Sequence, residues 1–112
     1  MTKALALAFL VLFLLALPTS GQAPAPQVLL DNPSVRVTSV SFVPGTGSGR
    51  HQGIEAEVGI VVEGELLLDS PMGRTPVRAG AAYFRPGLMP HDTRNDSSRP
   101  AKLIEIFLER CD

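Results

Sequence analysis

The sequence contains a single cysteine, Cys111, in a chain of 112 residues. One cysteine excludes an intrachain disulfide. This thiol lies next to the last residue and has no histidine near it in the sequence, so it is a weak candidate for a catalytic nucleophile. Any chemistry is therefore expected from other side chains.

A run of basic residues is also missing. The 10 lysine and arginine residues and the 11 aspartate and glutamate residues are scattered along the chain, which has a formal net charge of -1. Nucleic acids and anionic membrane surfaces are bound through clustered positive charge, and these residues form no such cluster in the sequence. The charge distribution therefore predicts neither nucleic acid nor a membrane surface as a partner.

The chain has one long apolar run, residues 4–17, which follows Lys3 and ends at Pro18. A basic start, an apolar middle of about 7–15 residues and an exit of small residues are typical of a secretory signal peptide. The alternative is a transmembrane anchor, which needs about 20 apolar residues. We expect residues 1–21 to be a cleaved signal peptide, so that the mature chain is periplasmic or secreted and not bound to a membrane.

Sustained helical periodicity is absent after the apolar run. Residues 22–27 alternate with proline, which forbids a helix and predicts an extended leader. Residues 28–112 suffice for one domain, and their short alternating segments between Gly, Pro and Asp turns predict an all-β antiparallel barrel or jelly roll. The expected strands are 28–30, 35–43, 54–62, 65–69, 75–78, 81–85, 92–95 and 102–109.

Two stretches with the same construction contain the residues of chemical interest. In residues 45–64, a glycine-rich loop delivers His51, and an alternating strand then carries Glu57. In residues 80–95, an apolar segment and a proline-containing loop deliver His91. Imidazole and carboxylate groups both bind divalent transition metals. Taken on their own, however, His51 and Glu57 are more simply interpreted as a solvated loop histidine and an exposed strand glutamate.

Together the two stretches resemble the paired motifs of the cupin superfamily over roughly residues 35–109. The matching residues are Gly45, His51, Glu57 and Gly64 in the first motif and Gly80, Pro86, His91 and Asn95 in the second. The sequence departs from the motifs at two positions. Gly53 stands where the family has a further histidine, and Leu88 takes the slot of a glycine that comes one place early, as Gly87.

The resemblance implies a small cupin barrel with one divalent transition metal, Fe, Mn, Ni, Zn or Cu, bound by His51, Glu57 and His91. Gly53 leaves an additional coordination position for water or substrate and weakens the site. An open metal position polarises a substrate oxygen, which predicts an oxygenase or isomerase acting on a small oxygenated molecule. The alternative is a non-catalytic cupin that binds a small ligand or a metal at a degenerate site.

Four further side chains are candidate contacts to a substrate. Glu55 is expected on the same strand face as the ligands, where the alternative is a solvated rim carboxylate. Arg85 precedes the second loop and would bind an anionic substrate or pair with a surface carboxylate. Tyr83 and Met89 flank the second motif and would wall an apolar pocket or simply belong to the core.

The strand expected at residues 54–62 is apolar on both of its faces. Such a strand is buried on both faces, and a chain this short has little with which to cover the outer one. Either the N-terminal strand or a second subunit must cover Val58 and Ile60. A homodimer, which the resemblance to cupins also implies, is the simpler solution.

Overall fold

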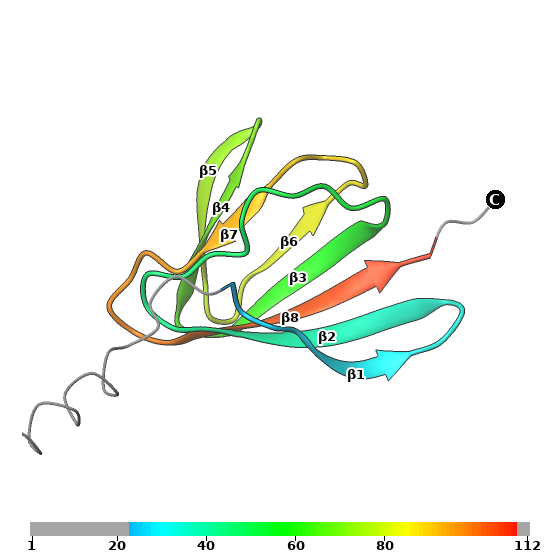
Figure 1. Ribbon diagram of the computed structural model, residues 1–112, viewed down its shortest axis with the longest axis horizontal. Coiled ribbons are helices and arrows are strands. Elements are labelled where there is room, and N and C mark those ends of the chain that lie inside the picture. The colour runs from blue at the N-terminus through cyan, green and yellow to red at the C-terminus, as the bar shows by residue number, and fades with distance from the viewer. Residues whose placement is uncertain (1–22, 110–112) are drawn as a thin grey trace, which may run out of the picture.

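The computed structural model describes residues 23–109, so the predicted signal peptide and Cys111 lie outside the described residues (Figure 1). Eight strands form two antiparallel sheets that face each other, which confirms the predicted all-β fold. No helix in the described part is long and apolar enough to cross a membrane. The strands are β1 (Gln27–Asp31), β2 (Val35–Phe42), β3 (Ala56–Glu63), β4 (Glu65–Ser70), β5 (Gly73–Arg78), β6 (Ala82–Arg85), β7 (Asp92–Arg94) and β8 (Ala101–Leu108).

The larger sheet has the strand order β1-β2-β8-β3-β6, and the smaller has the order β5-β4-β7. All eight strands lie within two residues of the predicted bounds. The largest differences are two residues each, at the starts of β3, predicted at residue 54, and β5, predicted at residue 75. Residues 52–55 instead form an irregular segment between an isolated bridge at His51 and the strand.

The hydrophobic core occupies one end of the space between the sheets. Its buried side chains are Val40, Phe42, Val61, Leu66, Val77, Ala101 and Leu103. These residues come from β2, β3, β4, β5 and β8, where alternating side chains of the facing strands meet. The core therefore closes this end of the barrel and leaves the other end for polar groups.

Strand pairing arranges the inner side chains of the larger sheet in rows of increasing polarity. Next to the apolar end, Thr38, Glu105, Gly59 and Tyr83 lie opposite one another across β2, β8, β3 and β6. The following row contains Arg36, Phe107, Glu57 and Arg85. Because strand side chains alternate, this face of the sheet runs from an apolar floor to a charged mouth.

The outer face of the same sheet is apolar. Val58 lies opposite Ile106 and Ile60 opposite Ile104, and all four side chains are half-buried. Phe84, which neighbours Val58 on β6, is 62% exposed. Strand β1 pairs edge to edge with β2, so it does not cover β3. A homodimer that covers this face stays a prediction.

We expect Ile60→Glu to weaken the predicted homodimer at least about tenfold, or about 1.4 kcal/mol, because a two-fold interface would bury the new carboxylate twice. Thr75→Glu, on the exposed side of β5, is the matched control and should leave association unchanged. Sedimentation velocity over a range of concentrations measures both variants. A monomeric parent protein at high micromolar concentration would contradict the prediction.

Candidate functional site

The two predicted histidines are brought side by side by the backbone. The amide of each donates to the carbonyl of the other at 2.9 Å, forming an isolated antiparallel bridge between the two motifs. The ring centroids of His51 and His91 lie 4.1 Å apart. The His91 side chain is buried, whereas His51 is exposed at the mouth of the barrel.

Each imidazole is held in one tautomer by a backbone carbonyl. Nδ1 of His51 lies 2.8 Å from the carbonyl oxygen of Gly49, and Nδ1 of His91 lies 3.1 Å from that of Met89. A carbonyl can only accept, so Nδ1 carries the hydrogen and Nε2 of the neutral ring has a free lone pair. Burial lowers the pKa of His91, and the positive charge of Arg85 contributes to this shift, which keeps the ring neutral at pH 7.

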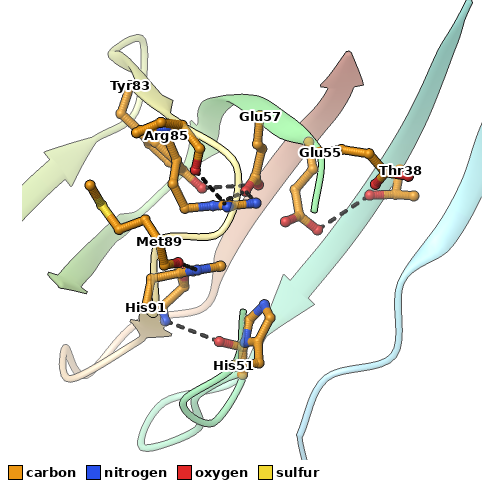
Figure 2. Close-up of polar contacts among 12 residues, drawn as sticks. Thr38, His51, Glu55, Glu57, Tyr83, Arg85, Met89 and His91 are labelled. Atoms are coloured by element: carbon orange, nitrogen blue, oxygen red, sulfur yellow. Dashed lines mark hydrogen bonds and ion pairs between the residues drawn. The ribbon is translucent and has the colours of Figure 1, made fainter. Parts of the chain in front are cut away.

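Glu57 lies deeper in the barrel and forms an ion pair with Arg85 (Figure 2). Nε and Nη2 of Arg85 both lie 2.9 Å from Oε2 of Glu57, and the Tyr83 hydroxyl donates to Oε1 at 3.3 Å. The Arg85 and Glu57 side chains are only 3% and 1% exposed. Both carboxylate oxygens are therefore engaged inside the protein.

A second carboxyl group adjoins this pair. Glu105 on β8 is hydrogen-bonded to Glu57 and accepts a hydrogen bond from the Thr38 hydroxyl at 3.3 Å. Burial, together with the neighbouring Glu57 carboxylate, raises the pKa of Glu105 to about 8. Burial alone would raise the pKa of Glu57 too, but hydrogen bonding to Glu105 and the charge of Arg85 hold it below its ordinary value. At neutral pH Glu105 thus keeps its proton and Glu57 is ionised.

A cavity of about 350 Å³ opens beside these groups. Its wall includes three predicted site residues, His51, Glu55 and Arg85, and its floor is formed by Val40, Phe42 and Leu103. Glu55 forms a rim ion pair with Arg36 at 3.6 Å, and the Arg36 guanidinium also stacks 4.7 Å from the centre of the Phe107 ring. The cavity is large enough for a small metabolite.

The other predicted substrate contacts do not have the roles that were expected. Tyr83 lies inside the barrel but touches Glu57 rather than the cavity, and burial raises its pKa, which keeps the hydroxyl protonated. Met89 contributes its backbone carbonyl to His91. Arg85 was expected to bind an anionic substrate or a surface carboxylate, and its partner is instead a buried carboxylate.

Sequence reasoning missed Glu105, Arg36 and Thr38. The pattern of β8 contained a signal, because Glu105 and Phe107 share one face and three aliphatic residues share the other. The conventional reading puts the aliphatic face inside. In this barrel the mixed face lines the cavity and the aliphatic face points outward.

The loop of the second motif shows why its glycine is at residue 87 rather than at residue 88. A Cβ atom at Gly87 would lie 2.2 Å from the carbonyl oxygen of Ile54, so the close approach of two backbones requires glycine there. Leu88, in the usual glycine slot, has a φ of 65°. A non-glycine residue in this left-handed region costs about 1–2 kcal/mol. The loop therefore keeps the conformation that glycine usually supplies, at that cost in stability.

The residues only partly fit the metal centre that the motifs implied. Both histidines direct Nδ1 to a backbone carbonyl and turn Nε2 away from it, which is the arrangement of metal-binding imidazoles. The Glu57 carboxylate, however, already has a cationic partner in Arg85. Among residues 23–109, no three His, Cys, Asp or Glu side chains are placed to hold one ion together. The three-residue set therefore does not fit.

The matching family model is the cupin domain, over residues 38–107, so the chain belongs to the cupin family. It is 39% identical over 94 residues to the Beta-alanine degradation protein BauB of Pseudomonas aeruginosa, covering 80% of this chain and 99% of the relative. A cupin domain from Bordetella pertussis superposes with a TM-score of 0.69 at 29% identity, covering 83% of this chain and 100% of that structure. An RmlC-like cupin with a double-stranded β-helix fold from Methanocaldococcus jannaschii gives 0.71 at 13% identity, with 82% and 85% covered, and supports the fold alone.

Proposed function

We propose that the protein binds a small polar molecule of zero net charge in the barrel cavity. The observation that carries the proposal is the pairing of charges around the cavity. Arg85 pairs with Glu57 and Arg36 with Glu55, while Glu105 and His91 are neutral at pH 7. The formal charges cancel. A ligand with a net charge would therefore be desolvated without compensation, whereas a neutral molecule or a zwitterion would not.

A zwitterion suits the wall because it contains groups of both kinds. Arg85 supplies N–H donors for a carboxylate, and Glu55 and Glu105 supply oxygen acceptors for an ammonium group. The relationship to a protein named for β-alanine degradation supports the same class, because β-alanine is a zwitterion at neutral pH. A three-carbon amino acid is small enough for the 350 Å³ cavity.

We expect β-alanine to bind at least tenfold more tightly, or about 1.4 kcal/mol, than propionate or propylamine, which have similar size and one net charge. Gly53 lines the cavity, and a Cβ atom there would contact only Arg85 Nη2, at 4.0 Å. The tryptophan ring in Gly53→Trp would therefore extend into the cavity and should abolish binding. Thr75→Trp, outside the cavity, is the matched control. Titration calorimetry measures the affinities. Tighter binding of either charged analogue, or unchanged binding in Gly53→Trp, would contradict the proposal.

A second candidate function is metal binding by the histidine pair alone. It is favoured by the two Nδ1 contacts to carbonyl oxygens, which leave both Nε2 lone pairs available. The ion would be a divalent Fe, Mn, Ni, Zn or Cu, and two imidazoles would leave most of its coordination sphere to water or substrate. That open sphere would be the basis of the predicted oxygenase or isomerase chemistry. Metal content that disappears in His91→Ala would support this candidate, and equal content in both proteins would eliminate it.

A further inference from the structure

We infer that Arg85 is a built-in cation that takes the place of a metal beside Glu57, and that Gly53, whose Cβ position adjoins the guanidinium, leaves it without a competing imidazole. The charge of Glu57 is balanced by Arg85 rather than by an ion. Only the ligand contact assigned to Arg85 rests on the proposed function.

The first line of support is the contact itself. Glu57 and Arg85 are direct neighbours in the β3–β6 register, and two guanidinium nitrogens lie 2.9 Å from the same carboxylate oxygen. Nη1 of Arg85 is fixed by the carbonyl oxygen of Pro86 at 3.1 Å. A guanidinium held by three such contacts is a rigid, permanently charged partner for the carboxylate. A metal ion would have to displace it to reach Glu57.

The second line of support is the space at residue 53. A Cβ atom built on Gly53 meets a single neighbour within 4 Å, Nη2 of Arg85 at 4.0 Å. Arg85 is therefore the side chain that an imidazole at residue 53 would adjoin. With glycine at residue 53, no imidazole stands beside the guanidinium to compete for Glu57.

The third line of support is charge. Arg85 and His51 line the same cavity. The guanidinium therefore repels a divalent ion held by the histidines. Arg85 thus discourages a metal both by occupying Glu57 and by its own field.

The arrangement also leaves part of Arg85 for the ligand. A guanidinium has five N–H bonds, and three are used by Glu57 and Pro86, which leaves two in a residue that lines the cavity. These donors can bind a carbonyl or carboxylate oxygen of the ligand. Unlike a metal, this cation cannot dissociate, so the contact is independent of metal supply.

The test compares Zn²⁺ binding by four forms of the protein: the parent, Gly53→His, Arg85→Met, and the double variant. If the guanidinium blocks the site, Gly53→His alone should bind Zn²⁺ no more than threefold better than the parent. The double variant, with Glu57 released and a third imidazole added, should bind one ion per chain at least a hundredfold more tightly. Combining Gly53→His with Arg94→Met, which removes an arginine paired with Asp92 and Asp96, should bind like Gly53→His. A hundredfold gain from Gly53→His alone would overturn the inference.

Glu57→Gln in the parent background provides a test that does not need the double variant to fold. Glutamine retains an oxygen for Arg85 but is a poor metal ligand. Because the change leaves the Arg85 charge uncompensated, parent Zn²⁺ affinity should fall, but less than about tenfold. A loss of about a hundredfold or more, as expected when a direct ligand is removed, would overturn the inference. The proposed function is tested separately by β-alanine binding in metal-free buffer. Failure there would leave the Zn²⁺ results unchanged.

Discussion

Arg85→Met should lower the free energy of unfolding by about 3–5 kcal/mol, because it leaves the Glu57 carboxylate buried without its cationic partner. Both side chains are almost fully buried, so water cannot replace the guanidinium. In a domain of this size, such a loss corresponds to a fall in Tm of more than about 12 °C. Urea denaturation followed by circular dichroism measures it.

Two further variants separate the loss of an ion pair from the loss of packing. Combining Arg85→Met with Glu57→Leu removes both charges, and replacing a buried pair by apolar residues is often neutral, so most of the stability should return. Arg94→Met removes two surface ion pairs, with Asp92 and Asp96, each worth at most about 1 kcal/mol. A double variant less stable than Arg85→Met would show that the charges are not the cause.

Stability should also fall as the pH rises from about 6.5 to about 8. The folded protein keeps the proton of Glu105 until its pKa of about 8, whereas an unfolded glutamate has lost it above about 4.5. The unfolded state therefore binds fewer protons in this range, and one such group changes the free energy of unfolding by at most about 1.4 kcal/mol per pH unit. The contribution is complete below pH 4.5 and lost by the time Glu105 ionises.

The other buried groups limit the pH window. Burial lowers the pKa of His91, so this residue makes stability rise with pH up to 6.5, against the effect of Glu105. The lowered pKa of Glu57 acts in the same sense as His91, but only below 4.5. The range above 6.5 therefore isolates Glu105. Glu105→Gln, which keeps a donor for Glu57, should flatten the urea-measured stability between pH 6.5 and 8, and an unchanged slope would contradict the assignment.

The strands could be predicted from local sequence alone, because alternating apolar residues and turn residues occur within single short segments of the chain. The two motifs likewise predicted that His51 and His91 come from related loops, and the backbone bridge places them together. The partner of Glu57 could not be predicted in this way. It depends on the register of β3 against β6, which is set by the whole sheet rather than by either strand.

Which face of β8 points inward could not be predicted from the strand alone either. Its aliphatic residues face outward because the neighbouring strands place Thr38 and Gly59 on the inner side, opposite Glu105. Gly59 in turn has no side chain because the Tyr83 ring crosses it, at 2.2 Å from where a Cβ atom would be. These constraints join four strands, and none of them is visible in β8 alone.

The rows of increasing polarity along the larger sheet have a consequence for how a guest molecule would lie. A guest such as β-alanine is charged at both ends, so both ends would stay level with Arg85, Glu55 and His51, and its short hydrocarbon middle would face Val40, Phe42 and Leu103. A molecule inserted end-on would strand one charged group on the apolar floor. The barrel therefore favours a guest that lies across its mouth, and a bulkier hydrocarbon middle should be tolerated only until it reaches that floor.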